Sequence, residues 1–373
     1  NSATSDAITT ASDGTCTAKL TSVGGAGLSH RNKVINGGMV INQRASSYTS
    51  TGTEYTIDRF NHVATSSFTF DTTTTQDSST PDGFSKSLKI TPDSTQTPTG
   101  SHNGVIRQVF EGQDFQDLAF GTSSAKSVTV SFYAKSASSN NNHQYGLQLR
   151  TRDSSAQARY VSQAFTVTTS WQRYTMTFAG NTSVAIRNDN GNGFEICFHL
   201  ASGPDDIVSA KSTWTTSSAF QTVTGQSNFM DNTSNEFYLT GVQLEVGTVA
   251  TPFEHRSYGD ELNRCQRYYQ QFVGVSDQVC LGFGRSNGTT VAEFNVPLSV
   301  PLRASPTLNA CSWAVFTATN QSNSASQTPA VRKWDPYSNM LGCALSGMSG
   351  MTNARTLTVF LNNSDTFQMN AEL

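Results

Sequence analysis

Short runs of strand-forming residues, each closed by a turn cluster, follow one another from residue 34 to residue 246. In the segment SVTVSFYA, at 127–134, the apolar side chains at 128, 130 and 132 share one face of an extended chain. Clusters such as TPDG, NDNGNG and SGPDD supply the turns. Strands so short and so closely spaced, with no long helix between them, predict an all-β domain, an antiparallel β-sandwich of the jelly-roll kind.

About eleven strands are expected in this first domain. Their predicted ranges are 34–42, 55–63, 67–71, 85–90, 105–110, 128–135, 145–151, 160–167, 172–178, 194–200 and 237–246. Residues 202–235 are less regular, and we expect a long loop there that crosses the sandwich and contains short pieces of strand.

A change of period marks the end of the first domain. Ser257 and Asp260 have the spacing of a capping box, and Leu262, Cys265 and Tyr268 recur at helical intervals. We therefore predict a short amphipathic helix at 258–272. Its aromatic face either packs between two sheets or contacts another chain of an oligomer, and the sequence leaves both interpretations open.

A second series of strands follows this helix. Their predicted ranges are 279–283, 290–295, 306–310, 314–318, 329–334, 341–345, 356–361 and 366–373, and residues 322–329 are expected to form an exposed turn. This length suits a second, smaller β-sandwich. The predicted organisation is an extended arm at 1–31, the jelly roll at 32–256, the linking helix at 257–273 and a small C-terminal β domain at 274–373.

The low charge of the chain bears on its partners. Charged residues make up 14% of the sequence and the formal net charge is −3, whereas roughly 25% of residues are charged in an average soluble domain. The sequence has no basic patch of the kind that binds nucleic acid. No apolar run approaches the roughly 18 residues of a membrane span. We therefore expect neither a nucleic-acid partner nor insertion into a membrane.

The six cysteines show no CxxC pair and no regular spacing. Several lie in apolar runs such as FEICFHL and LGCALSG, where cysteine behaves as a small apolar residue. We expect free and mostly buried thiols, and hence assembly in a reducing cytosol rather than a disulfide framework.

A series of motifs carries a resemblance to a known family. In chain order they are NKVINGGMVINQRAS, EYTIDRFNHV, SVTVSFYAKS, WQRYTMTF and FYLTGVQLEVGTVATPFEHRSYGDELNRCQRYYQ. They span residues 32–272 and resemble a recurrent module of bacteriophage tail fibres and related virion fibres. The resemblance implies a virion appendage, assembled in the host cytoplasm as a homotrimer, whose distal part binds the host cell surface. It also implies that the arm at 1–31 contacts other structural proteins of the virion.

The first domain is also similar to carbohydrate-binding modules of the xylanase-associated jelly-roll type. In those modules, acidic residues near the first and last strands help to hold a structural calcium. Val40, Thr240 and Gly241 stand at these positions here. Because a hard cation needs several oxygen ligands, mostly carboxylates, we expect no metal in this chain and no other cofactor.

Sugar binding typically needs an aromatic platform beside amides and carboxylates. Two groups of residues in loop-like segments have this composition. They are Trp214 with Asp205 and Asp206, and Trp334 with Asp335 and Tyr337 in the stretch RKWDPYSN. The alternative is that both tryptophans pack against their own domains.

Paired carboxylates would be needed by an enzyme that cuts polysaccharide. Such pairs occur at Asp114 and Asp117, at Asp205 and Asp206, and at Asp260 and Glu261. Nothing in the sequence fixes their separation, and no repeat predicts the solenoid of a depolymerising tailspike. We expect no catalytic residues and a fibre that attaches to host surface polysaccharide without cutting it. The alternative is a capsid-decorating or head-fibre protein of the virion.

Overall fold

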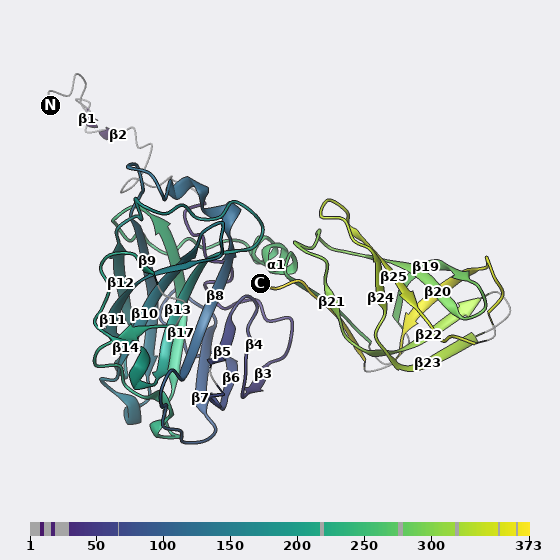
Figure 1. Ribbon diagram of the computed structural model, residues 1–373, viewed down its shortest axis with the longest axis horizontal. Coiled ribbons are helices and arrows are strands. Elements are labelled where there is room, and N and C mark those ends of the chain that lie inside the picture. The colour runs from purple at the N-terminus through teal and green to yellow at the C-terminus, as the bar shows by residue number, and fades with distance from the viewer. Residues whose placement is uncertain are drawn as a thin grey trace.

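The computed structural model describes residues 8–10, 16–18, 30–65, 67–216, 220–274, 279–317, 321–349, 351–362 and 365–373. Two β domains of unequal size lie on either side of the α-helix α1 (Tyr258–Gln266) (Figure 1). The predicted all-β fold, with a jelly-roll sandwich followed by a helix and a smaller β domain, is confirmed. Most of the predicted arm at 1–31 lies outside the described residues, apart from an antiparallel pair of short strands, β1 (Ile8–Thr10) and β2 (Cys16–Ala18).

The first domain consists of two facing sheets. One has the strand order β15 (Thr215–Thr216), β11 (Ala158–Thr166), β10 (Gln144–Arg152), β13 (Asn192–Ser202), β8 (Asn103–Glu111), β5 (Asn61–Thr65) and β4 (Glu54–Tyr55). The other has the order β12 (Gln172–Phe178), β9 (Val128–Ser136), β17 (Phe237–Val246), β7 (Ser87–Pro92), β6 (Thr72–Asp77) and β3 (Ser47–Ser50). Neighbouring strands in both sheets are antiparallel.

Alternating side chains build the core between the two sheets. On β9, Val128, Val130 and Phe132 are at most 1% exposed, as their spacing in the sequence predicts. The Phe132 ring meets the rings of Phe165 and Phe198 edge-on, with centroid distances of 5.1 and 5.0 Å. Burial of large apolar side chains is the main favourable term in folding, and edge-on ring pairs add to it.

Short helical turns and one small strand pair complete this domain. The 3-10 turns are η1 (Gly112–Leu118), η2 (Ser138–Asn140), η3 (Pro204–Asp206) and η4 (Phe229–Asp231). The segment predicted as a long loop carries the parallel pair β14 (Ile207–Val208) and β16 (Thr222–Val223), together with the edge strand β15.

Two strands predicted in the first domain are absent. The segment 34–42 contains no strand, because Asn36 and Met39 have φ angles of 59° and 57° and turn the chain away from extended geometry. The Asn36 side chain accepts a hydrogen bond from the Ile41 amide and donates one to the Ile41 carbonyl, so it closes this loop on itself. The segment that begins at Ser67, with φ of 62°, likewise forms no strand.

Helix α1 is shorter than the sequence predicts. The Ser257 hydroxyl accepts from the Asp260 amide at 3.2 Å and caps the N-terminus, as the capping-box pattern indicates. The helix ends at Gln266, and Tyr269–Val273 forms strand β18 instead of a further turn. The Tyr-Gln-Gln-Phe-Val sequence of β18 suits a strand, and pairing with the last strand of the chain satisfies its backbone.

The second domain also has two sheets. The larger follows the order β23 (Gln321–Gln327), β22 (Cys311–Thr317), β26 (Thr356–Leu361), β19 (Val279–Asn287), β20 (Val291–Pro297), β25 (Met340–Leu345) and β24 (Ala330–Lys333). The smaller joins β18, β27 (Thr366–Asn370) and β21 (Thr307–Leu308). The exposed turn predicted at 322–329 is wrong, because most of this segment pairs with β22 as β23.

The core of this domain is built around Trp313, which is fully buried. Its ring lies edge-on to Phe367 at a centroid distance of 5.2 Å, and its Nε1 donates to the Gln327 carbonyl at 2.8 Å. The core therefore joins strands from both sheets of the domain.

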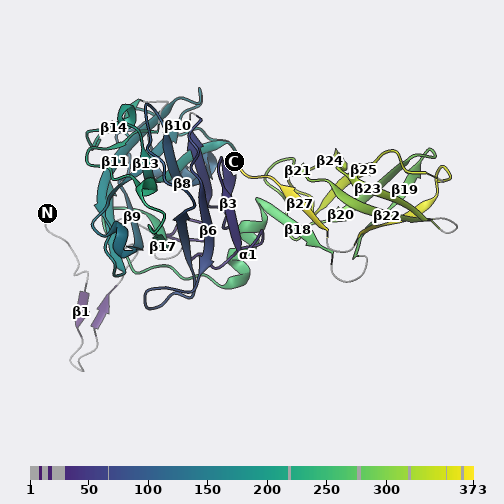
Figure 2. The ribbon, with the colours of Figure 1, turned by 90° about the horizontal axis from the view of Figure 1, so that it is seen from below.

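The end of the chain returns to the first domain. After β27, the chain runs back to the first domain and ends at the junction (Figures 1 and 2). The Glu372 carboxylate forms ion pairs with Arg59 and, at 2.9 Å, with Arg44. The hydroxyl of Tyr55 donates to the carbonyl of Leu373 at 2.8 Å. The second domain is thus held to the first at its entry strand and at its exit.

These arginines are buried along with Glu372. The Arg59 side chain has no exposed surface, and its guanidinium lies 3.4 Å from the centroid of the Tyr268 ring. Arg44 lies in the same way 3.9 Å from the Tyr269 ring. Burial favours the neutral form of Arg59, but Glu372 outweighs this effect and raises its pKa.

A second buried carboxylate, that of Glu111, binds the chain just after α1. It accepts two hydrogen bonds from Arg267, at 3.1 and 2.9 Å, and one from the Tyr268 hydroxyl at 2.8 Å. Arg303 of the second domain donates to the carbonyls of Ala371 and Asn190. The junction is therefore a polar, charged interface in which most charges are paired.

The five cysteines with described side chains are all free, as expected. Four of them are buried: Cys197, Cys265, Cys311 and Cys343. Cys280 is exposed.

The variant Glu372→Ala should lower the free energy of unfolding by about 3–5 kcal/mol, because it leaves the Arg59 guanidinium buried without its counter-charge. Urea or thermal unfolding measures the change. Glu293→Ala is the matched control, since it breaks an ion pair with Arg285, whose side chain is 72% exposed. We expect a much smaller change there, because an ion pair exposed to solvent contributes little to stability. Equal losses in the two variants would contradict this account of the junction.

Candidate ligand-binding cleft between the two domains

The first predicted sugar site does not form. Trp214 donates from Nε1 to the Ala179 carbonyl at 2.7 Å, and its ring lies edge-on to Phe120. Asp206 is buried and accepts from the Asn103 side chain at 2.6 Å. The strand registers place Trp214 near the Phe194 end of β13. Asp205 and Asp206 lie beyond the opposite end of this strand, after Ser202. The structure therefore does not bring these residues together, and Trp214 packs against its own domain.

The second predicted group lies in a tight turn of the second domain. The Asp335 carboxylate accepts from the Tyr337 amide at 2.8 Å, and its carbonyl accepts from the Ser338 amide at 3.1 Å. Tyr337 is 92% exposed, whereas Trp334 packs partly against the domain core. The turn thus presents a phenol ring to solvent, and a ligand-binding role for Trp334, Asp335 and Tyr337 stays a prediction.

The outer face of the larger sheet in the first domain carries a cluster of charges. Glu195, which is fully buried, forms ion pairs with Arg107, Arg150 and Arg152 at 2.9, 3.4 and 3.2 Å. Burial disfavours the charge of Glu195, but the three arginines outweigh it and lower its pKa to about 2. This carboxylate is therefore held ionised at neutral pH.

The segment that contains Phe220 and Gln221 covers this cluster of charges. The Phe220 ring lies over the guanidinium groups of Arg150 and Arg107, at 4.2 and 5.5 Å. The neighbouring Gln221 carbonyl accepts from the Gln148 side chain at 2.7 Å. This part of the sheet face is thus occupied by protein and is not open to a ligand.

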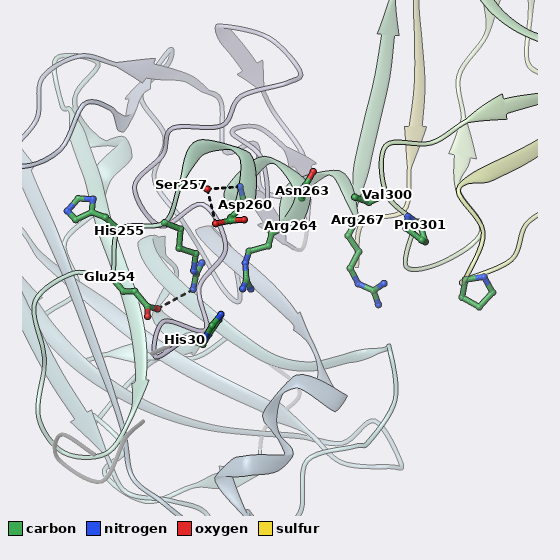
Figure 3. A pocket seen from close by; sticks show the side chains of 12 residues that line it. His30, Glu254, His255, Ser257, Asp260, Asn263, Arg264, Arg267, Val300 and Pro301 are labelled. Carbon is green, nitrogen blue, oxygen red and sulfur yellow. Dashed lines mark hydrogen bonds and ion pairs between the residues drawn. The ribbon is translucent and has the colours of Figure 1, made fainter. Parts of the chain in front are cut away.

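An open cleft of about 680 Å³ lies at the junction of the two domains (Figure 3). Helix α1 and the segment before it form one wall, and Val300, Pro301 and Pro336 of the second domain form the other. Pro336 belongs to the same turn as Tyr337, so this turn borders the cleft. A second cavity of about 240 Å³ adjoins the cleft and shares His30, Arg256 and Arg264 with it.

One wall of the cleft is fixed by Arg256. Its guanidinium donates to the carbonyls of Asn32 and Val34 and pairs with Glu261 at 3.3 Å and Glu254 at 3.7 Å. Burial disfavours the charge of Glu254, but the backbone amides of Asn32 and Arg31 outweigh it and, with Arg256, lower its pKa. Arg256 therefore serves mainly to hold the first residues of the domain against α1.

Two further arginines line the cleft. Arg264 lies in the C-terminal half of α1, and Arg267 is the first residue after the helix. Figure 3 shows Arg264 and Arg267 on the same side of the helix, with His30 opposite Arg264. Arg267 is held by Glu111, and its side chain is 38% exposed. The Arg264 side chain forms no hydrogen bond or ion pair within the part of the chain that the structure describes.

The cleft lining can bind hydroxyl and carboxylate groups. Asn263 supplies an amide, Glu254 and Asp260 supply acceptors, and the arginines supply forked donors. Asp260 already accepts from the Ser257 hydroxyl at 2.7 Å, and Glu254 is tied to the backbone and to Arg256. The lining carboxylates are thus oriented by the protein itself.

Among the described residues, no group of three or more potential metal ligands is found. Gly241, one of the positions that departs from the calcium-binding pattern, has φ of 61° at an irregular step of β17. A side chain there would lie within 2.7 Å of the Phe84 ring. The structure therefore needs glycine at this position for a conformational reason, and no acid could replace it without strain. No helix in the described part of the chain is long and apolar enough to cross a membrane.

No protein-family model matches the chain, and no curated protein is similar to it. Among solved structures, it is similar to the CBM22-1 xylan-binding domain of Xyn10C from Paenibacillus barcinonensis, with 12% identity and a TM-score of 0.28, over 55% of this chain and 94% of that one. A family 11 carbohydrate-binding module from Clostridium thermocellum gives 12% identity and a TM-score of 0.29, over 58% and 100%. The enzymatically active domain of tailspike protein 4 of bacteriophage CBA120 gives 16% and 0.30, over 58% of this chain and 21% of that one. Likenesses at this level do not define the function of the chain.

The sequence did not single out the cleft residues Arg264 and Asn263. They occupy helical positions that look like ordinary solvent-facing surface. The signal that was present is the density of charged and polar residues in FEHRSYGDELNR, which is high for a chain with 14% charged residues.

Two buried histidines predict a marked loss of stability in mild acid. Burial lowers the pKa of His62 to about 4, and burial with a contribution from Arg150 lowers that of His199 to about 3. The unfolded chain takes up these protons near pH 6.5, so their contribution to stability is complete above that pH and is lost below it. Each histidine should contribute a slope of about 1.4 kcal/mol per pH unit.

Urea unfolding between pH 7.5 and pH 5 measures this slope. The variant His199→Gln should lower the slope by about 1.4 kcal/mol per pH unit, because it removes one proton that only the unfolded chain takes up in this range. An unchanged slope in His199→Gln would show that His199 is not held neutral in the folded protein.

Proposed function

We propose that this chain is a non-enzymatic fibre protein of a phage virion that attaches to a host surface glycan in the cleft between its two domains. The observation that carries the proposal is the cleft itself. Its volume of about 680 Å³ lies in the range of small-molecule sites, roughly 300–1,000 Å³, and its lining offers both donors and acceptors.

The turn beside the cleft supports a saccharide as the ligand. Sugars bind through hydroxyl groups that need planar polar partners and through CH faces that pack on aromatic rings. Asn263 and the arginines provide the polar partners, and Tyr337, next to the cleft-lining Pro336, provides an exposed ring. This combination is absent from the covered sheet face around Glu195.

The state of the carboxylates supports binding without cleavage. A glycosidase needs one carboxyl group free to donate a proton and another free to attack or to activate water. Glu254 has its pKa lowered and is bound by two backbone amides and Arg256, and Asp260 caps α1 together with Ser257. Both groups are engaged in holding the protein structure.

Assembly and location follow from the resemblance of residues 32–272 to virion fibres. In this proposal the chain is a homotrimer, the arm at 1–31 contacts other virion proteins, and the cleft faces the host. The low charge and the polar, uncharged surface suit a protein exposed on a particle.

The variant Asn263→Trp should abolish glycan binding, because an indole at this exposed helical position would fill the cleft. The measurement is binding of purified protein to host cells and to an oligosaccharide array. Ser123→Trp, at an exposed loop position of the first domain, is the matched control and should bind normally. Tyr337→Ala should weaken binding about tenfold, which is 1.4 kcal/mol. Phe283→Ala, another exposed ring, should not.

Normal binding by Asn263→Trp would place the ligand elsewhere on the molecule. Shortening of the polysaccharide during incubation with the pure protein would show an enzyme instead.

Light scattering on the full chain should give the mass of a trimer, about three times 40.2 kDa. Immunogold labelling of the particle should place the protein on the tail. A stable monomer would contradict the trimer, and label on the capsid faces would favour a decorating protein.

A further inference from the structure

We infer that the inter-domain cleft selects a saccharide that carries a carboxylate, and that Arg264 is the residue that binds this group. The inference rests on the proposed glycan-binding function and names the class of glycan. It is carried by the balance of charges in the cleft lining, which holds three arginines and two carboxylates.

Two of the three arginines are already paired with buried acids. Arg256 pairs with Glu261, and Arg267 is bound through two hydrogen bonds by Glu111, which is fully buried. The carboxylates of Glu261 and Glu111, neither of which lines the cleft, balance the charges of these two arginines. These two arginines therefore present donors to a ligand but little unbalanced charge.

Arg264 differs from them in having no such partner. Its side chain forms no ion pair or hydrogen bond within the described residues, and Asp114, across the adjoining cavity, acts on it only electrostatically. A cation without a partner in a half-buried position attracts an anion more strongly than a paired one does. Arg264 lines both the cleft and the adjoining cavity, so a ligand in either can reach it.

The charge and shape of the site favour a carboxylate. The guanidinium fork of arginine matches a planar carboxylate through two parallel hydrogen bonds. A carboxylate brings one negative charge, which balances one unpaired arginine. A phosphate monoester brings up to two, and the nearby Glu254 and Asp260 would repel the excess.

The test uses the full chain and an array of neutral, phosphorylated and carboxylated oligosaccharides, the last group including uronic and sialic acids. We expect carboxylated members to be bound. The best of them is then compared with its carboxyl-reduced counterpart, in which each acid is an alcohol. Reduction should weaken binding about tenfold or more, and the loss should shrink as the salt concentration rises.

The variant Arg264→Gln should lose the preference for the carboxylated oligosaccharide over its reduced form, and Arg264→Lys should keep part of it. Because Arg264 has no partner within the described residues, neither variant should change the unfolding temperature appreciably. Arg285→Gln removes an exposed arginine of the second domain and is the control that should keep the full preference.

The outcomes separate this inference from the proposed function. Binding of neutral oligosaccharides only, or a preference for phosphorylated ones, would overturn the carboxylate inference and leave glycan binding intact. An unchanged preference in Arg264→Gln would overturn the role of Arg264. Binding of no oligosaccharide at all would overturn both the inference and the proposed function.

Discussion

The Glu372 carboxylate lies between the guanidinium groups of Arg59 and Arg44, and the arrangement of the two domains depends on it. Arg59 comes from a turn of the first domain, and Glu372 is the second-last residue of the chain, so the contact closes a loop of more than three hundred residues. A buried charge is costly without a partner, and neither group could be buried alone. The pair therefore requires the second domain to end where it began, against α1.

This closure also makes the cleft. One wall comes from α1 and the segment before it, and the other from loops of the second domain. The cleft exists because β18, which leads into the second domain, pairs with β27, which leads back out of it. Glu111 binds the chain just before this strand pair, and Arg303 binds it just after. A site of this kind is built from the junction rather than from either sandwich.

Much of the fold is readable from the sequence, and the exceptions have physical causes. The sequence predicts the strands Gln172–Phe178 and Phe237–Val246 residue for residue, the first from its alternating side chains and the second from its apolar and β-branched content. The segment 34–42 has equally suitable residues, but the Asn36 side chain satisfies the backbone locally and bends the chain. The helix predicted to continue to residue 272 ends early because β27, nearly a hundred residues later, pairs with that segment. A local sequence pattern cannot predict a strand partner that lies so far away along the chain.

The candidate site was only partly within reach of the sequence. The turn at Trp334–Tyr337 was singled out for its composition, and the structure places it beside the cleft. Arg264 was not, because an arginine on an exposed helix is ordinary until its neighbours are known. What distinguishes it is that two nearby acids, Glu111 and Glu261, are bound to other arginines, and that Asp114 acts on it only across a cavity. That property belongs to the folded junction.

The return of the chain has a mechanical consequence for the joint between the two domains. A domain joined by a single linker transmits a pulling force through one strand. Here the second domain is joined to the first by its entry strand β18 and by the chain terminus after β27. The strands β18 and β27 pair with each other over five residue pairs. Tension on the distal end is shared between two connections in parallel, one covalent and one ionic. The joint should therefore resist bending as well as stretching, so that the cleft keeps its shape under load.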